Sequence, residues 1–263
     1  MLPEIAGLLV CPVCGASLVR AGPVLRCAAG HSFDVARQGY VNLMPGGARP
    51  GTADTAGMVA DRAAFLSAGH YAPLASAVAD LAAVLGRLGP GAVGLAMDLS
   101  ARALRRAARA APGIGAIGWD TWQPFPVRPA AVSVILNVFA PRNGPEFRRV
   151  LRPGGALIVA TPAPGHLAEL AGLVTLISVD EHKDERLAAT LGPYFTAAER
   201  RPVTVPLRLS RAEAATLAGM GPSARHAGPA ATRARLATLA EPIDVTAAFH
   251  VTVYRPRPER NGR

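Results

Sequence analysis

Lysine is almost absent from this chain of 263 residues: Lys183 is the only one, and every other fixed positive charge is an arginine. The formal net charge is +10 and the isoelectric point lies near 10.8. A strongly basic surface favours a polyanionic partner such as RNA, because each phosphate contact releases a counterion. The same richness in Arg, Ala, Gly and Pro is also typical of a GC-rich genome. Charge alone therefore identifies no partner.

Long apolar runs are also missing. Half of the residues are hydrophobic and the mean hydropathy is +0.25, yet no stretch reaches the roughly 18 uninterrupted apolar residues that a membrane-spanning helix requires. No positively charged segment precedes the short apolar stretch at the N-terminus, so no signal peptide is expected. The sequence predicts a cytoplasmic protein with no membrane partner.

Cysteine is scarce, and all three cysteines lie within the first 27 residues. Three cysteines cannot form a disulfide framework, and in a reducing compartment a metal site is the better use for them. Two residues separate Cys11 from Cys14, and three separate Cys27 from His31. Three thiolates and one imidazole suit a closed tetrahedral zinc site, although ordinary buried cysteines are the alternative. Because all four positions are filled, the predicted zinc ion is structural.

The sequence predicts four regions. Residues 1–45 form a small zinc-binding finger, and residues 46–57, rich in Gly and Pro, form a linker. Residues 58–255 form one larger domain, and residues 256–263 form a basic tail. A unit of about 40 residues rarely stabilises itself without a metal or a disulfide, which agrees with a structural zinc ion in the finger.

Strands alternate with helices in the larger domain. The segment from Met58 to Leu88 is helical with one break at residues 69–73, and Ser100 is the expected N-cap of a helix over 100–110. Such alternation is typical of a doubly wound parallel sheet that binds ligands at the carboxyl ends of its strands. The other expected elements are strands at 93–99, through Ile117, at 131–139 and at 156–161, helices at 144–151 and 210–220, a turn at 152–155, and a strand pair around 204–210 and 245–254.

Several segments carry a family resemblance. CPVCG (11–15), AGHYAPL (68–74), NVFAPRN (137–143) and LRPGG (151–155) occur in this order. Together they resemble the bacterial 23S ribosomal RNA guanine-N1 methyltransferases, especially the branch that confers resistance to tylosin or mycinamicin. The resemblance implies an RNA-recognising zinc finger, a Rossmann-like domain that binds S-adenosylmethionine, and a homodimer. It also implies that N1-methylguanine is made in a 23S RNA hairpin near the peptide exit tunnel.

The resemblance assigns four residues to the methyl donor. Tyr71 and His182 fall where the family contacts the donor, Asp98 where a carboxylate accepts hydrogen bonds from the ribose, and Asp120 where a side chain faces the adenine. Three of the four also have plainer interpretations. Tyr71 suits core packing, Asp98 suits a helix start, and His182 lies in a charged run typical of a solvated helix face. Asn137 either contacts substrate or caps a turn.

The sequence departs from the family in one place. A strand and a turn of the type Asp-x-Gly-x-Gly-x-Gly should precede the strand that ends in Asp98, but only residues 86–92 intervene after Leu85. Glycine in that turn lets backbone N–H groups approach the donor. In an alternative alignment residues 93–99 are the first strand, but the glycine-rich turn should then follow at residues 100–102, which contain no glycine. The predicted fold is therefore a zinc finger plus a Rossmann-like class I methyltransferase domain that lacks its first strand and helix.

Three functional hypotheses follow. The first is methyl transfer from S-adenosylmethionine to guanine N1, which carries a proton at neutral pH and needs a base. Asp54 and His182 are candidates for that base, and the sequence alone does not choose between them. The second is a homologue that binds RNA without transferring a methyl group. The third is the inactive product of a damaged gene.

Overall fold

The computed structural model describes residues 3–45, 53–84, 91–174, 183–221 and 228–258. The chain divides into two compact units, which are described separately below. No helix within these ranges is both long enough and apolar enough to cross a membrane. The first unit comprises Met1–Asp54, Gly86–Ile135 and Pro141–Gly155, and the second comprises Thr55–Leu85, Leu136–Ala140 and Ala156–Arg263.

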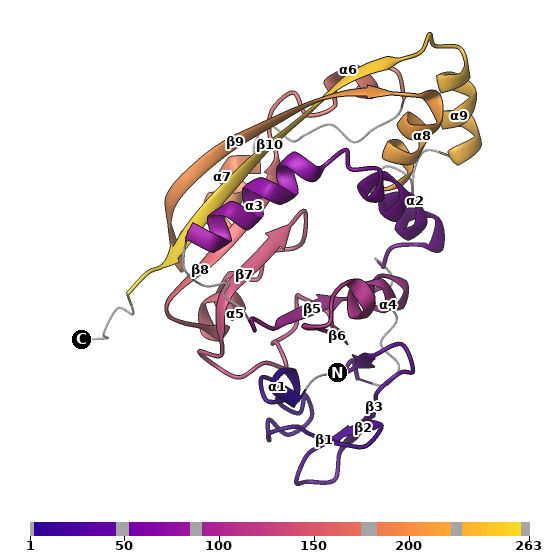
Figure 1. Cartoon of the computed structure of the whole chain (residues 1–263). Helices are drawn as coiled ribbons and strands as arrows, with labels where there is room; N and C mark the ends of the chain where they lie inside the picture. Colours follow the sequence, from indigo (N-terminus) through magenta and orange to yellow (C-terminus); the bar gives the residue numbers. More distant parts are fainter. Residues whose placement is uncertain (1–2, 46–52, 85–90, 175–182, 222–227, 259–263) are drawn as a thin grey trace. The chain divides into compact units, whose positions relative to one another are not determined.

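The first unit contains two three-stranded sheets. In one sheet β2 pairs antiparallel with both β1 and β3, and in the other β6 pairs parallel with both β4 and β5. Helix α4 packs on the parallel sheet (Figure 1). The elements are α1 (Pro3–Ala6), β1 (Val19–Ala21), β2 (Val24–Arg26), β3 (Ser32–Asp34), β4 (Tyr40–Asn42), β5 (Gly94–Asp98), α4 (Ala101–Ala110), β6 (Ile114–Gly118) and α5 (Gly144–Val150).

Helix α4 begins where the sequence predicts. The Ser100 hydroxyl accepts a hydrogen bond from the Ala103 N–H, as expected of an N-cap that satisfies a free amide of the first turn. Leu104, 2% exposed, anchors the helix on the parallel sheet. The predicted helix over 100–110 is confirmed.

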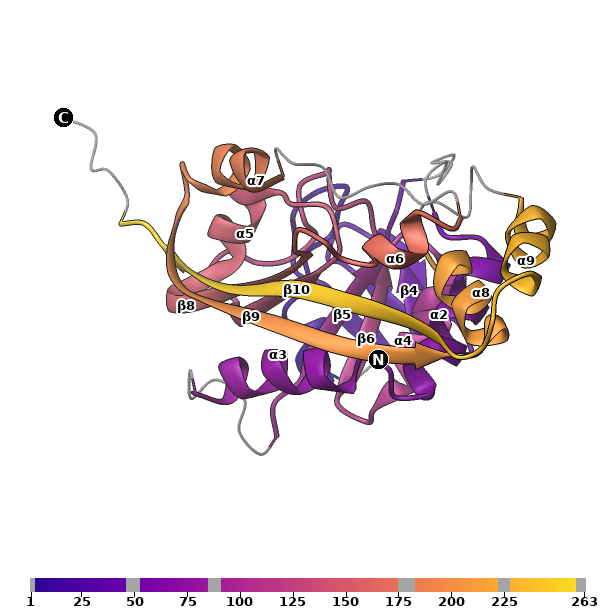
Figure 2. The same cartoon turned by 90° about the horizontal axis from the view of Figure 1, so that it is seen from above.

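The second unit is built around a long antiparallel ribbon. Strand β10 pairs antiparallel with both β8 and β9, and the sheet order is β7-β8-β10-β9. Helix α3 runs along β9 and β10, as Figures 1 and 2 both show. The elements are α2 (Ala56–Ser67), α3 (Ala72–Val84), β7 (Val132–Val138), β8 (Leu151–Pro162), α6 (Ala168–Ala171), α7 (Lys183–Leu191), β9 (Phe195–Leu209), α8 (Arg211–Gly219), α9 (Pro229–Ala237) and β10 (Ile243–Pro256), of which β7 and β8 begin in the first unit.

The predicted helices are found, but one predicted turn is not. The expected helical pair around residues 69–73 corresponds to α2 and α3, and the last expected helix corresponds to α8. The expected turn at residues 152–155 is wrong, because β8 already begins at Leu151. A Cβ at position 155 would lie only 2.9 Å from the Arg152 carbonyl oxygen. Glycine at this position therefore allows close packing of the backbone.

The arrangement of the strands locates the missing element. A doubly wound sheet has the order 3-2-1-4-5-6. Here β6 and β5 correspond to strands 3 and 2, while β7 and β8 correspond to strands 4 and 5. Among the described residues, no strand pairs with β5 on its second edge or joins the parallel sheet to the antiparallel ribbon. The domain is therefore Rossmann-like, and the described residues contain no strand 1. The predicted position of the loss, residues 86–92, lies mostly outside the described residues, so the deletion remains a prediction.

The expectation of one parallel sheet needs a correction. Strands β4, β6 and β5 pair parallel in one sheet. In the other, the hydrogen bonds from the Ala131 N–H to the Val150 carbonyl oxygen and from the Phe139 N–H to the Ala160 carbonyl oxygen run in the same direction along β7 and β8, whereas β10 pairs antiparallel with β8 and β9. The third parallel strand is β4, which belongs to the segment predicted as the finger. The boundaries at residues 45 and 57 are not tested by these pairings and remain predictions.

Candidate functional site

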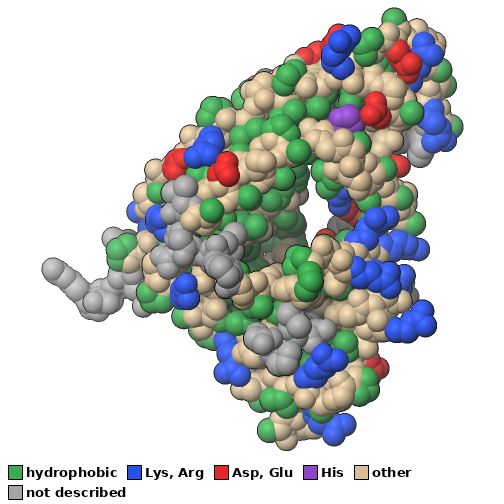
Figure 3. All heavy atoms as spheres, viewed as in Figure 1, with side chains coloured by type: hydrophobic (Ala, Val, Ile, Leu, Met, Phe, Trp, Pro, Cys, Tyr) green, Lys and Arg blue, Asp and Glu red, His purple; other side chains and the backbone are tan. Residues whose placement is uncertain are grey.

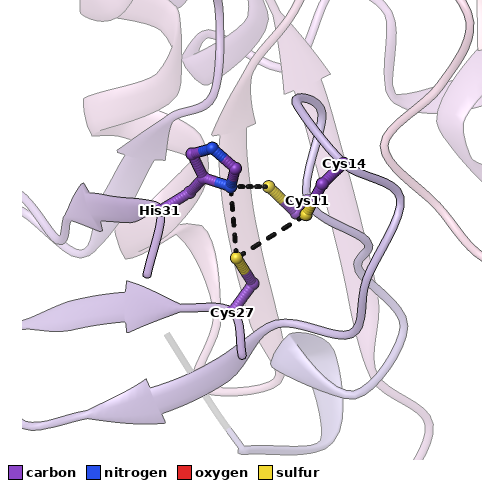
Figure 4. A group of neighbouring side chains, drawn as sticks. All are labelled: Cys11, Cys14, Cys27 and His31. Carbon is purple, nitrogen blue, oxygen red and sulfur yellow. Dashed lines mark hydrogen bonds between the residues drawn. The ribbon is translucent and has the colours of Figure 1, made fainter. Parts of the chain in front are cut away.

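The first half of the cysteine cluster is a tight turn. The Gly15 N–H donates to the Cys11 carbonyl oxygen at 2.8 Å, and the Cys11 N–H donates to the Ala16 carbonyl oxygen at 2.7 Å. Gly15 has a φ of +72°, a conformation that glycine adopts at little cost. The turn directs the Cys11 and Cys14 sulfurs toward the same point (Figure 4).

The second half is the loop of the β2–β3 hairpin. Arg26 pairs with Ser32, so Cys27 and His31 stand at the two ends of a five-residue loop. The Cys27 N–H donates to the His31 carbonyl oxygen at 3.0 Å, and Gly30, with a φ of +87°, closes the turn. This geometry places the second pair of ligands side by side.

The distances within the cluster fit a tetrahedral zinc ion. With Zn–S near 2.3 Å and Zn–N near 2.0 Å, neighbouring sulfurs should lie about 3.8 Å apart and sulfur and nitrogen about 3.5 Å apart. The Cys14 and Cys27 sulfurs are 3.7 Å apart, and His31 Nδ1 lies 3.6 Å from the Cys11 sulfur and 3.4 Å from the Cys27 sulfur. All four ligand atoms lie within 4.8 Å of one another. The structural zinc site predicted from the spacing is confirmed.

The protein environment suits a thiolate at Cys27. Burial opposes ionisation, but hydrogen bonds involving the His31 side chain and backbone lower the pKa of Cys27 to about 6. Cys11 and Cys27 are buried, and Cys14 is exposed. A closed set of four ligands leaves no open coordination position, so the site holds the finger together instead of activating a substrate.

Backbone hydrogen bonds attach the finger to the rest of the first unit. Leu9 forms an antiparallel bridge with Val127, and the Val10 N–H donates to the Pro126 carbonyl oxygen at 3.0 Å. The Arg128 guanidinium donates to the Ser17 hydroxyl at 2.7 Å. The finger is thus packed against residues 126–128 as well as linked through the chain.

The carboxyl ends of β5 and β6 bring two predicted donor-binding residues to one edge. Asp98 is opposite Gly118 in the parallel register, and Asp120 follows Gly118 by two residues. Asp98 Oδ1 accepts a hydrogen bond from the Ser100 N–H at 2.6 Å, and Asp120 Oδ1 accepts one from the Trp122 N–H at 3.0 Å. Each carboxylate orders the turn that follows its strand, so both the local and the ligand-binding interpretations of Asp98 remain open.

The same edge carries a residue that the sequence did not identify. Asn42 ends β4 opposite Gly118, and a Cβ on Gly118 would lie 2.7 Å from Asn42 Oδ1. The Ser100 hydroxyl lies 3.4 Å from the Asp54 carbonyl oxygen, to which it donates, so Asp54 belongs to this edge too. The only sequence signal for Asn42 was the short apolar segment YVNL, which is too brief to indicate a strand by periodicity.

The other two donor-binding predictions are placed differently. Tyr71, in the second unit, is 5% exposed and packs edge-on against Phe65 and Phe249. Burial raises the pKa of its hydroxyl, which therefore stays protonated at neutral pH. His182 lies outside the described residues. Asn137 is buried in β7 at 4% exposure. The donor-binding roles of all four predicted residues remain predictions.

The chain is similar to one family model and to several known proteins. Residues 9–49 match a zinc-ribbon family model described as RlmA, N-terminal. The chain is 48% identical to a protein of Micromonospora griseorubida named as a 23S rRNA (guanine-N1)-methyltransferase, over 97% of this chain and 100% of that protein. It is 42% identical to the 23S rRNA (guanine(748)-N(1))-methyltransferase of Streptomyces fradiae, over 98% of this chain and 100% of that protein. The solved YcgJ protein of Bacillus subtilis aligns with a TM-score of 0.42 and 9% identity, over 63% of this chain and 82% of that chain.

The alignment lengths bear on the missing strand. The alignment with the Micromonospora protein runs over 295 residues, which is 32 more than this chain contains, and that with the Streptomyces protein runs over 283, which is 20 more. Both relatives therefore contain segments without a counterpart here. A segment of this size suffices for a strand, a turn and a helix. Because the identity extends over almost the whole of each protein, this chain belongs to the family of 23S rRNA (guanine-N1)-methyltransferases.

Proposed function

We propose that this chain transfers a methyl group from S-adenosylmethionine to guanine N1 in a hairpin of 23S ribosomal RNA, at a low rate. The observation that carries the proposal is the 48% identity to a family member over nearly the whole chain. The substrate implies that the protein works in the cytoplasm, and the family implies a homodimer. Methylation of a guanine near the exit tunnel would link the chain to macrolide resistance.

The finger and the sheet edge have separate roles in this proposal. The zinc ion keeps Cys11, Cys14, Cys27 and His31 together, so that the finger offers a fixed surface to RNA. S-adenosylmethionine supplies the methyl group when bound. Asp98 and Asp120, at the carboxyl edge of the parallel sheet, are suited to hold its ribose and adenine.

The missing strand limits the binding of the donor. The glycine-rich turn that would offer backbone N–H groups to the methionine end has no counterpart in this sequence. Each hydrogen bond to a charged group is worth about 1.5 to 3 kcal/mol. Losing two of them would weaken binding by about 10² to 10⁴. The residues present therefore fit the nucleoside half of the donor better than its amino-acid half.

The acceptor guanine also makes a demand on the site. Its N1 proton must leave as the methyl group arrives, so a base must lie within hydrogen-bonding distance of N1. Asp54 is a candidate because it lies on the same edge as Asp98. His182 is the other candidate, and it lies outside the described residues.

A second function is favoured by the divided sheet: a homologue that holds RNA but transfers nothing. Calorimetric titration with S-adenosylmethionine separates the two. We expect weak binding by the natural chain, and binding at least about 100-fold tighter when a relative's strand–turn–helix is inserted after Leu88. If the natural chain gives no heat at millimolar donor while it still binds RNA, the second function is correct.

The proposed dimer is tested separately. Analytical ultracentrifugation of the zinc-loaded chain should give twice the mass of 27.1 kDa at micromolar concentration. A monomer at that concentration would remove the dimer from the proposal without affecting the proposed reaction.

A further inference from the structure

Helix α4 has an unusual charge pattern. It contains four arginines, Arg102, Arg105, Arg106 and Arg109, and no acidic residue. At 3.6 residues per turn these four side chains fall within an arc of about 100°. All four are exposed, whereas Leu104 on the opposite side is 2% exposed. The helix therefore presents a purely basic face to solvent and an apolar face to the sheet.

The charge of this face is not neutralised within the described part of the chain. Among the described residues, none of the four arginines forms an ion pair or a side-chain hydrogen bond. Helix α5 differs, because Arg149 pairs with Glu146 at 2.7 Å. Arginines spaced by four positions on one helix repel each other, and Arg102 lies near the positive end of the helix dipole. Arg109 in the last turn interacts favourably with the helix dipole, but the other charges repel one another, so folding alone does not account for four arginines on one face.

The basic face continues onto the segment that links the zinc ribbon to the parallel sheet. A Cβ built on Gly39 would lie 3.6 Å from the Ala108 Cβ, so the turn before β4 lies directly against α4. Arg37, two residues earlier, is exposed and has no ion-pair partner among the described residues. Figure 3 shows basic side chains gathered over this part of the first unit. We call Arg37 and the four arginines of α4 the basic surface.

We propose that the basic surface binds the phosphate backbone of the 23S RNA substrate, beside the finger. This inference rests on the proposed function, since it names the surface that meets the same RNA. Guanidinium groups form paired hydrogen bonds with phosphate oxygens and retain their charge at any physiological pH. Contacts to phosphate carry no sequence information, so this surface would position the RNA while other residues select the guanine.

The test compares two double variants with equal changes in charge. Arg105→Gln with Arg109→Gln removes two charges from the basic surface. The control, Arg233→Gln with Arg235→Gln, removes two charges from the exposed helix α9 of the other unit. Binding of an unmodified 23S RNA hairpin is measured at salt concentrations from about 50 to about 300 mM, a range that resolves the counterion slope.

The α4 variant should bind about tenfold more weakly at about 0.1 M salt, and its slope of log affinity against log salt should be smaller by about 1 to 2. The control should keep the natural slope. The melting temperature of the α4 variant should change little, because the relief of repulsion between Arg105 and Arg109 offsets the loss of the favourable interaction of Arg109 with the C-terminal end of the helix dipole. A charge-preserving variant, Arg105→Lys with Arg109→Lys, should retain most of the slope.

Three results would overturn the inference. Equal losses in the α4 variant and the control would mean that only net charge matters. An α4 variant that binds like the natural chain would exclude the surface while leaving the proposed function intact. Failure of the natural chain to bind the hairpin even at low salt would refute RNA binding itself, and this inference with it.

Discussion

Two substitutions of Tyr71 separate core packing, which uses its ring, from contact with the methyl donor, which would use its hydroxyl. The ring is 5% exposed and packs at 5.1 Å from the Phe65 ring and 5.0 Å from the Phe249 ring, at angles of 84° and 79°. Tyr71→Ala removes a buried aromatic ring and both edge-on contacts. Such truncations cost about 3 to 5 kcal/mol. That loss is a large fraction of the stability of a typical domain.

Tyr71→Phe removes only the hydroxyl. If Tyr71 mainly packs the core, this change should alter the free energy of unfolding by no more than about 1 kcal/mol. Urea denaturation followed by circular dichroism gives both values, and Trp122→Ala is the control, because Trp122 is 64% exposed and should change stability by less than about 0.5 kcal/mol. Calorimetry with S-adenosylmethionine is run on the same proteins.

The outcomes are distinct. A loss below about 1 kcal/mol for Tyr71→Ala would refute the packing described for the second unit. Normal stability of Tyr71→Phe together with loss of donor binding would show that the hydroxyl contacts the donor, as the resemblance implies. Unchanged donor binding would leave Tyr71 as a core residue.

Three further predictions concern the metal, the alkaline limit and the sheet edge. Dialysed protein should contain about one zinc ion per chain by atomic absorption. Cys27→Ser should lose the zinc ion, and hydrogen exchange of the Val10 amide should become faster. A natural chain without zinc, whose thiols are freely alkylated, would refute the zinc finger. Burial raises the pKa of Tyr71 above its unfolded value near 10, so the neutral hydroxyl contributes fully to stability below about pH 10 and this contribution is lost as the pH rises further. Tyr71→Phe should therefore flatten the decline of the unfolding free energy between about pH 10 and about pH 11.5. Parallel curves of unfolding free energy against pH for the variant and the natural chain would contradict this. Gly118→Ala should destabilise the protein by about 1 to 3 kcal/mol, because the new Cβ would lie 2.7 Å from Asn42 Oδ1. In the control Gly57→Ala the nearest atom lies 3.9 Å from the new Cβ, so this change should stabilise slightly. Equal shifts in melting temperature for the two variants would exclude the clash.

The zinc site was predictable because its determinants are local. Cys11, Cys14, Cys27 and His31 lie within 21 positions of one another, and the turns that direct them depend on nearby glycines such as Gly15 and Gly30. Helix α4 was equally accessible, since Ser100 and the spacing of its apolar residues mark it. Features of this kind need no knowledge of distant contacts.

Strand β4 shows why other features were missed. It has only three residues, and its partner β6 lies more than seventy positions further along the chain. A strand that short is defined by its pairing and not by its own pattern of hydrophobicity. The start of β8 was misplaced for a related reason, since Arg152-Pro153-Gly154-Gly155 has the composition of a turn. Of the residues at the carboxyl edge of the sheet, Asp98 and Asp120 were named from the family resemblance, whereas Asn42 was missed because β4 is defined by its distant partner β6.

The most direct test of the central claim is the rate of methyl transfer to unmodified 23S RNA. Radiolabelled S-adenosylmethionine is supplied to the natural chain and to the chimera with a glycine-rich strand–turn–helix inserted after Leu88, and primer extension locates the modified guanine. A family member without strand 1 should label guanine N1 far more slowly than the chimera, which should approach enzyme-like rates of about 1 per second. Equal, enzyme-like rates for both proteins would contradict the claim that the missing strand limits this chain.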